Sequence, residues 1–480
     1  MNASSARLDI IVNGAGLSGL ATAITCALHG HAVTVLESAL DVIEDTGAAV
    51  QITPNGARLL EHWGVLSQLW EATATPTVFS IHRYNGALLA RERDFDKNME
   101  AKYSAPFFDV FRSDLQRVLY TRAKELGVRF RFDEEVISID LPTSSISEFA
   151  GPEVATASGK LFTGDLVIGA DGLCSVTRRG LPGQRVSPKP NGTHIYRAAL
   201  PIDHVLDEKL RTLIRYPEVH FWIGPGIHAV GYSLRNGSAY SLTLFVETAI
   251  PKSVDAIGEM RELLAGWDPI LEKILDHVDT VDKRSLMHYE ELQRWANSDS
   301  NLVLAGESCH PMLPCLGQEA NSSLEDGVVL GTLLGKLTSK AQLPHALHLY
   351  ERLRKTRGQA VLKETLNQRY DFHLPDGIEQ EARDATFLRQ LGKEVTAPFP
   401  SRWTCPGVQE WLYGYDAVKD VEDALRRSPW SENPMNGKCK QLTGKNTAAT
   451  VSTASSGEQV VVKQRPLLSR LKSKLRKPSS

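Results

Sequence analysis

Three separated segments of the chain carry residues suited to holding a dinucleotide. The first has Gly14, Gly16 and Gly19 at G-x-G-x-x-G spacing, between an alternating apolar stretch at 8–12 and an Ala-rich run at 20–28. Gly14 permits a tight turn, Gly16 lets the backbone approach a pyrophosphate, and Gly19 allows a helix to pack closely on a strand. The N-terminus of that helix offers free N–H groups and the positive end of a dipole to the phosphates. The segment therefore predicts a dinucleotide site.

Glu37 limits which dinucleotide this site can bind. It follows a second apolar run at 32–36, roughly 20 residues after the glycines. A carboxylate at this place can grip the ribose hydroxyls of the adenosine, and it disfavours a 2′-phosphate. The nucleotide at this site is therefore not NADP, while NAD and FAD both remain open.

Two later segments complete a pattern that resembles a known family. Residues 169–178 read Gly-Ala-Asp-Gly-Leu-Cys-Ser-Val-Thr-Arg, and residues 303–326 contain Gly306-Glu307-Ser308-Cys309-His310-Pro311. With these, residues 7 to about 370 resemble the single-component FAD-dependent aromatic hydroxylases, which include salicylate hydroxylase, p-hydroxybenzoate hydroxylase and fungal biosynthetic enzymes. The resemblance implies that the nucleotide is FAD.

The resemblance also implies which residues contact FAD. In the family the second segment contacts the pyrophosphate, and the third wraps the ribityl chain and opens a helix toward the flavin ring. A small-residue loop around Ala49 approaches the flavin, and the first residue of a helix at Arg112 reaches FAD. The implied cofactor residues are Gly14, Gly16, Gly19, Glu37, Ala49, Arg112, Asp171, Gly172, Glu307 and Ala320.

Three positions depart from the family pattern. Glu307 stands where the family has Asp, Glu319 where it has Gly, and Cys315 where Tyr is common. The longer Glu307 side chain must fold back or displace the backbone, and active sites tolerate little looseness. A Glu319 carboxylate aimed at the flavin would oppose the negative charge that builds up on reduction, unless it points to solvent. We expect FAD binding to survive these changes more readily than catalysis.

The reaction follows from the resemblance as well. NADH or NADPH would reduce FAD, O2 would add to the reduced flavin, and the resulting C4a-hydroperoxyflavin would hydroxylate or otherwise oxygenate an aromatic or phenolic molecule, in secondary metabolism or aromatic catabolism. Two alternatives stay open: a flavin oxidoreductase that inserts no oxygen, and an FAD-binding homologue impaired by Glu307 and Glu319.

Arg197 and Tyr232 are the candidate catalytic residues. They lie in alternating stretches predicted as strands, 195–200 and 228–234, and resemble an Arg and a Tyr with which fungal members bind a substrate oxyanion. Arg stays charged when partly desolvated, which suits a phenolate or carboxylate. An Arg paired to a neighbouring acid and a Tyr filling core remain equally open. His310 is a weaker candidate for proton relay.

The pattern of elements predicts an α/β protein: a discontinuous Rossmann-like FAD-binding domain interleaved with a mixed β-sheet substrate domain, and a helical C-terminal extension. The FAD-binding domain takes residues 1–75, 107–185 and 296–370, with a helix at 344–369. Residues 76–106 and 186–295 are assigned to the substrate domain, mainly as short alternating strands. Residues 371–430 form a helical cap, and 431–480 form a disordered basic tail.

Composition excludes several other classes. The 480 residues carry a net charge of −3, which gives no bulk electrostatic reason to bind nucleic acid. The six cysteines form no C-x-x-C pair, so we expect a reduced, cytoplasmic setting and no metal site. We expect no transmembrane span, although Leu at helical spacing in the basic stretch 465–477 leaves weak contact with a membrane surface open. The residues do not choose between monomer and homodimer.

Overall fold

A five-stranded parallel sheet forms the first layer of the computed structural model, which describes residues 6–41, 47–141, 151–181, 187–251, 253 and 255–430. Its strand order is β18-β12-β1-β2-β8. The strands are β1 (Asp9–Asn13), β2 (Ala32–Leu36), β8 (Arg129–Arg131), β12 (Leu166–Gly169) and β18 (Leu302–Leu304). Every residue of β12 and β18 is buried, as expected for parallel strands covered on both faces.

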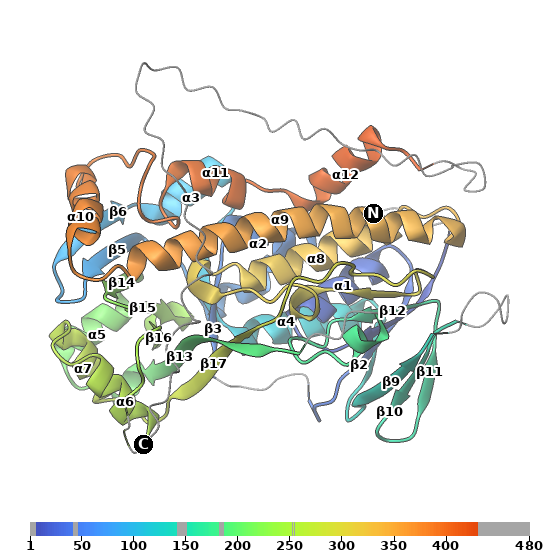
Figure 1. Ribbon diagram of the computed structural model, residues 1–480, viewed down its shortest axis with the longest axis horizontal. Helices are drawn as coiled ribbons and strands as arrows, with labels where there is room; N and C mark the ends of the chain where they lie inside the picture. The colour runs from blue at the N-terminus through green and yellow to red at the C-terminus, as the bar shows by residue number, and fades with distance from the viewer. Residues whose placement is uncertain are drawn as a thin grey trace, which may run out of the picture. The chain divides into compact units, whose positions relative to one another are not determined.

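Three helices belong to this layer: α1 (Leu17–Leu28), α4 (Arg112–Glu125) and α8 (Glu319–Leu334). α1 and α8 approach each other closely, because a Cβ on Gly327 of α8 would lie 2.5 Å from the backbone nitrogen of Thr22 on α1. The long helix α9 (Leu343–Phe372) packs beside α8 (Figure 1) and contains the predicted helix 344–369.

A seven-stranded sheet forms the second layer, in the order β17-β13-β16-β15-β14-β5-β6. Its neighbours pair antiparallel except β14 and β5, which are parallel. The strands are β5 (Val78–Arg83), β6 (Leu88–Arg93), β13 (Lys189–Pro201), β14 (Glu218–Gly224), β15 (Ile227–Leu234), β16 (Ala239–Val246) and β17 (Asp282–His288). All residues of β14, β15 and β16 are buried, so both faces of this sheet are covered.

Three short helices cover one face of this sheet: α5 (Glu208–Arg215), α6 (Ala256–Leu263) and α7 (Pro269–Leu275). They lie inside the region we interpreted as mainly strands. Each begins after an aspartate whose side chain accepts a hydrogen bond from a backbone N–H of the first turn: Asp207, Asp255 and Asp268. These N-caps are the sequence signal that would have found the helices.

The remaining strands form two small sheets. One has the order β3-β7-β4, with β3 (Ala49–Ile52), β7 (Phe108–Phe111) and β4 (Thr73–Ala74). The other has the order β11-β10-β9, with β9 (Val136–Asp140), β10 (Glu153–Thr156) and β11 (Leu161–Thr163). Two further helices, α2 (Pro54–His62) and α3 (Phe95–Tyr103), flank the first of these sheets and β5.

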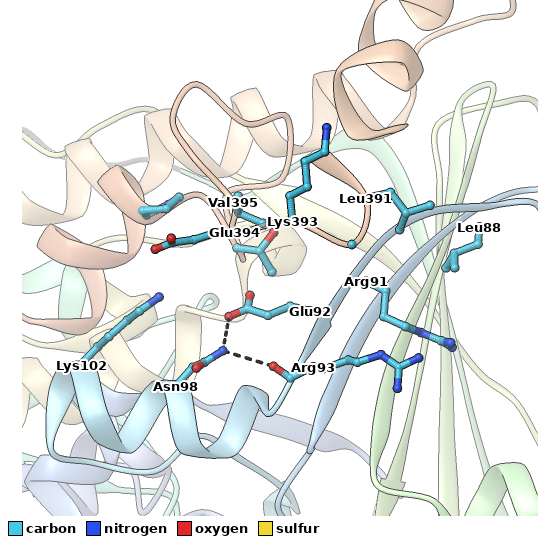
Figure 2. Close-up of a pocket in the computed structure, with 13 residues that line it drawn as sticks. Leu88, Arg91, Glu92, Arg93, Asn98, Lys102, Leu391, Lys393, Glu394 and Val395 are labelled. Carbon is cyan, nitrogen blue, oxygen red and sulfur yellow. Dashed lines mark hydrogen bonds between the residues drawn. The ribbon is translucent and has the colours of Figure 1, made fainter. Parts of the chain in front are cut away.

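The C-terminal helices α10 (Ile378–Gln390), α11 (Pro406–Tyr413) and α12 (Ala417–Arg427) follow α9. Between α10 and α11, the buried Trp403 contacts Phe79 and Phe221 of the seven-stranded sheet, with ring centroids 6.0 and 5.6 Å apart. A surface cavity of about 540 Å³ separates the 391–395 loop from β6 and α3. Figure 2 shows Glu92 and Asn98 hydrogen-bonded at its base and Lys102 beside it.

Residues 1–432 cluster as a single unit. The boundaries between the FAD-binding domain, the substrate domain and the helical cap therefore remain a prediction. The predicted disordered tail, 431–480, lies outside the described residues. None of the helices in the described part of the chain has both the length and the apolar character of a membrane span.

Candidate active site

A groove with a cavity of about 290 Å³ lies where the two layers meet. The N-termini of α1, α4 and α8 reach it from the first layer, and β13 reaches it from the second. Seven of the predicted site residues line it: Gly16, Ala49, Arg112, Gly172, Arg197, Glu307 and Ala320. Gly14, Gly19, Glu37, Asp171 and Tyr232 are not part of this lining. The tertiary structure therefore brings together residues from β13 and β17 of the second layer, from β3, and from four separate stretches of the first layer.

The three glycines of the first segment have different surroundings. Gly14 has φ +103°, and a Cβ there would lie 2.5 Å from the carbonyl oxygen of Ala170. A Cβ on Gly19 would lie 2.0 Å from the carbonyl oxygen of Gly14. A Cβ on Gly16 would meet only the Arg112 guanidinium, at 3.8 Å. Contacts within the chain thus require Gly14 and Gly19, whereas Gly16 faces open space at the N-terminus of α1.

Glu37 and Asp171 use their carboxylates to hold the chain itself. Glu37 accepts hydrogen bonds from the backbone N–H groups of Ala15, at 2.7 Å, and Ala39, at 3.0 Å. Asp171 accepts from Asn13 Nδ2 at 3.0 Å and from Ser175 Oγ at 2.6 Å. It also accepts from the backbone N–H and hydroxyl of Thr177, both at 2.9 Å. These bonds shape the loops around the groove and leave the backbone at Gly172 to face it.

Arg178 is a positioning residue for which the sequence assigned no role. Its guanidinium donates to the carbonyl of Ser308 at 3.1 Å and to that of Leu173 at 2.8 Å, and lies 4.2 Å from the Tyr289 ring centroid. The Tyr289 hydroxyl donates to the carbonyl of Glu307 at 2.8 Å. This clamp joins the second and third motif segments. Arg178 is the last residue of the 169–178 motif, and this place in the motif could have indicated its role.

A buried ionic network holds α8 to α9 behind the groove. Arg354, which is 0% exposed, pairs with Glu325 at 2.8 Å and with Asp326 at 2.6 Å. Arg357 donates two bonds of 2.7 Å to Glu325. Burial raises the pKa of Asp326, but its interactions with His310 and Arg354 outweigh the effect of burial and hold that pKa at about 2.

Asp326 connects this network to the groove-lining loop. It accepts a bond of 2.8 Å from the backbone N–H of Gly306 and a short bond from His310 Nε2. Cys309, His310 and Asp326 place possible metal-ligand atoms within 4.8 Å of one another. Burial, however, raises the pKa of the Cys309 thiol well above its ordinary value, which disfavours the thiolate that a metal needs. We interpret the cluster as part of the structural network.

Arg197 opens into the groove from β13. Its Nη1 lies 3.9 Å from Asp282 on β17, and 27% of its side chain is exposed. Asp282 is more closely bound by Arg284, whose Nε donates to it at 3.0 Å. The guanidinium of Arg197 therefore forms only a long ion pair with Asp282 and keeps an exposed side toward the groove. Arg197 can thus pair with a neighbouring acid and still bind a substrate anion.

Tyr232 lies on the same face of the sheet but deeper. It pairs with Ser241 in the register, while Arg197 pairs with Thr243, two residues along β16. Tyr232 is only 4% exposed. Burial raises the pKa of its phenol, and the nearby Asp109 carboxyl adds to this, so Tyr232 is a hydrogen-bond donor at neutral pH.

Glu319 and Glu307 are two of the three departures from the family pattern. Glu307 is exposed at the groove, so its extra methylene has room. Glu319 does not point to solvent: its Oε2 is buried without a hydrogen-bond partner in the described structure. Burial raises the pKa of Glu319, the Glu307 carboxylate adds to this, and Arg197 and Arg112 oppose it. The raised pKa weakens the opposing charge that the sequence led us to expect at this position.

The pKa shift of Glu319 predicts a pH-dependent stability. Because the folded state binds the proton more tightly than the unfolded chain, Glu319 contributes most below its unfolded pKa, and this contribution is lost as pH rises through the folded pKa. Glu319→Gln has no such loss, so its free energy of unfolding should rise relative to the wild type as the pH increases above about 4.3, the usual pKa of an unfolded glutamate. Urea unfolding of both proteins across this range measures it; a constant difference would contradict the prediction.

Comparisons with known proteins decide the family. A family described as "FAD binding domain" matches residues 7–365. The FAD-dependent monooxygenase OpS4 of Beauveria bassiana is 41% identical over 425 residues, which cover 87% of this chain and 97% of the relative. The chain belongs to the FAD-dependent monooxygenases. The 3-amino-4-hydroxybenzoate 2-monooxygenase PtmB3 of Streptomyces platensis is 29% identical over 86% of this chain and 98% of its own length.

Solved structures share the fold of this monooxygenase. A salicylate hydroxylase in a substrate complex superposes with a TM-score of 0.68 at 19% identity, covering 87% of this chain and 98% of its own. The predicted family, the α/β fold class and the FAD cofactor are thereby confirmed.

The groove of the monooxygenase fits FAD. Its Ser18 hydroxyl is buried without a partner in the described structure, beside the open face of Gly16. Two helix N-termini, at α1 and α8, face the same cavity and favour negative charge. Arg112 and Arg197 add positive charge from opposite sides. The groove can thus receive a pyrophosphate near Gly16 and an electron-rich ring edge near Ala320.

Proposed function

We propose that this monooxygenase hydroxylates a phenolic or similarly electron-rich aromatic small molecule, with NADH or NADPH as reductant and O2 as co-substrate. The Arg197 guanidinium carries this proposal, because it opens from the second layer into the groove that fits FAD. The name of the S. platensis relative, a hydroxybenzoate monooxygenase, supports the same substrate class.

In this proposal Arg197 anchors the substrate oxyanion. A guanidinium keeps its charge when partly desolvated and binds a phenolate or carboxylate well. Holding a phenol as its anion makes the ring richer in electrons, which favours attack on an electrophilic oxygen. Tyr232 keeps its proton and lies on the same face of the sheet as Arg197.

The cofactor residues that line the groove keep their proposed roles. Gly16, Ser18 and the N-terminus of α1 hold the pyrophosphate, and Arg112 neutralises part of its charge. Ala49 and Ala320 leave room for the ring, and the N-terminus of α8 favours the negative charge of the reduced form. When bound, FAD supplies the hydride acceptance and the oxygen activation that no side chain offers. The raised pKa of Glu319 weakens the opposition that its carboxylate would offer to that charge.

Replacing Arg197 should damage substrate use without loss of flavin. Arg197→Ala removes a charged hydrogen bond, so kcat/KM for an aromatic substrate should fall about 10- to 100-fold. Tyr232→Phe should have a smaller effect, since Tyr232 does not line the groove. Steady-state NAD(P)H oxidation measures both, with the exposed Arg129→Ala as control. Unchanged turnover in Arg197→Ala would reject its role.

A substrate screen tests the function itself. The purified protein should show a bound-flavin spectrum, and phenols or hydroxybenzoates should stimulate NAD(P)H consumption with a product heavier by one oxygen. Hydrogen peroxide as the sole product with every aromatic tested would favour the non-oxygenating alternative.

The cellular location and the oligomeric state of the enzyme are separate questions. We propose a cytoplasmic location, because the five cysteines in the described residues are all free, as in a reducing compartment. Monomer and homodimer both remain compatible. For the tail, equal sedimentation with anionic liposomes of chains with and without residues 461–480 would exclude the membrane contact.

A further inference from the structure

A second cavity lies against α9, next to the flavin groove but separate from it. This α9 cavity has a volume of about 410 Å³ and is lined mainly by apolar and aromatic side chains, among them Trp295, Met312, Leu362 and Leu366. It shares Met287, Pro311 and Met312 with the lining of the groove. These shared residues are a wall with a cavity on each side.

Two polar atoms of residues that line the α9 cavity lack partners in the described structure. Trp295 is 2% exposed, and its Nε1, which can only donate, is buried without an acceptor. His310 donates from Nε2 to Asp326, so its Nδ1 is left as an acceptor in the neutral ring, and this atom is also buried without a partner. The two ring centroids are 5.1 Å apart. An unpaired donor and an unpaired acceptor therefore lie on two neighbouring rings.

The charged groups at the rim are already paired. Lys355 lies 3.2 Å from Glu291 and donates to the carbonyl of Leu292 at 2.7 Å. Arg369 lies 3.0 Å from Glu247. A ligand of the α9 cavity therefore meets aromatic and apolar walls with two polar atoms, which suits a neutral molecule.

Gly358 keeps the cavity open from the middle of α9. A glycine inside a helix costs about 1 kcal/mol relative to alanine. Packing does not require it here, because a Cβ on Gly358 would meet only Met312 Cε, at an ordinary 3.7 Å. What its missing side chain provides is space in the α9 cavity, which Gly358 lines.

We propose that the α9 cavity is a second binding site, for a neutral hydroxylated aromatic molecule. A hydroxyl group donates one hydrogen bond and accepts others, so a ligand hydroxyl inserted at the edge of the two rings can accept from Trp295 Nε1 and donate to His310 Nδ1. The aromatic body packs against Trp295 and Met312, which favour flat and polarizable partners. A molecule bound here touches Pro311 and Met312, whose other side faces the flavin groove.

Calorimetric titration of the FAD-loaded enzyme with 2-naphthol, without any reductant, tests the site independently of turnover. Gly358→Leu should fill the cavity and Gly358→Ala should not, so the wild type and Gly358→Ala should bind one more 2-naphthol per chain than Gly358→Leu. Leu366 is 41% exposed, so Leu366→Trp is a second blocking variant that changes a surface side chain. Flavin absorbance and thermal unfolding confirm that each variant is folded and loaded.

Two further comparisons test the hydrogen bonds. Trp295→Phe keeps an aromatic ring but removes the donor, and 2-methoxynaphthalene keeps the acceptor oxygen but cannot donate to His310; each should weaken binding at this site by about tenfold. Equal stoichiometry in the wild type, Gly358→Leu and Leu366→Trp overturns the site, as does a wild type that binds no 2-naphthol beyond the groove. Equal affinity of the two naphthalenes, or of the wild type and Trp295→Phe, overturns the proposed recognition. Because no reaction occurs, a failure here leaves the proposed hydroxylation untouched.

Discussion

Purified Gly16→Val protein is expected to be folded but colourless. The Cβ at this position meets only the Arg112 guanidinium, at 3.8 Å, so the chain itself has room for the new side chain. The backbone of Gly16, with φ −69° and ψ −179°, is extended and suits valine. The valine methyl groups would instead occupy the space at the N-terminus of α1 that we assign to the pyrophosphate. Flavin released on heating, compared with protein concentration, measures the loss.

A matched glycine provides the control for this experiment. Gly407 lies in the first turn of α11, outside the groove lining, and a Cβ there would lie 4.0 Å from Ala397. Gly407→Val should retain flavin. Thermal unfolding of both apoproteins checks that the fold survives. A yellow Gly16→Val protein with the flavin content of the wild type would refute the assigned pyrophosphate position.

Arg354→Met is expected to lower the free energy of unfolding by about 3–5 kcal/mol, because it leaves buried acids without their partner. Arg357 still binds Glu325 in this variant, but Asp326 is left with His310 and the Gly306 N–H. Since Asp326 holds the loop that lines the groove, flavin affinity should fall as well. Urea unfolding and flavin titration measure the two effects.

Two further variants separate the loss of the buried ion pairs of Arg354 from a general effect of substitution on stability. Arg352 lies on the same helix but is exposed, so Arg352→Met should cost less than about 0.5 kcal/mol. Neutralising the stranded acid should restore part of the stability, so the Arg354→Met, Asp326→Asn double variant should be more stable than the sum of the single effects. Strict additivity would mean that the Arg354–Asp326 ion pair contributes little.

Local patterns predicted many of the elements. The alternating stretch at 195–200 became part of β13 (Lys189–Pro201), and the stretch at 228–234 became β15 (Ile227–Leu234). Alternation reports on a strand because neighbouring side chains face opposite sides of a sheet. The strands β14, β15 and β16 are nevertheless buried on both faces, and the helices whose aspartate caps were overlooked cover one of these faces.

By itself, the sequence determined the family, the fold class and the FAD cofactor, because the glycine spacing and the two later motifs are short-range patterns that keep their meaning without coordinates. Only the tertiary structure decided how individual side chains are used. It directs the carboxylates of Glu37 and Asp171 toward the chain, buries an oxygen of Glu319, and sets Tyr232 behind the groove. Burial and hydrogen-bond partners come from residues far apart in the chain, as in the bond from Asn55 to Glu325, and no local spacing records them.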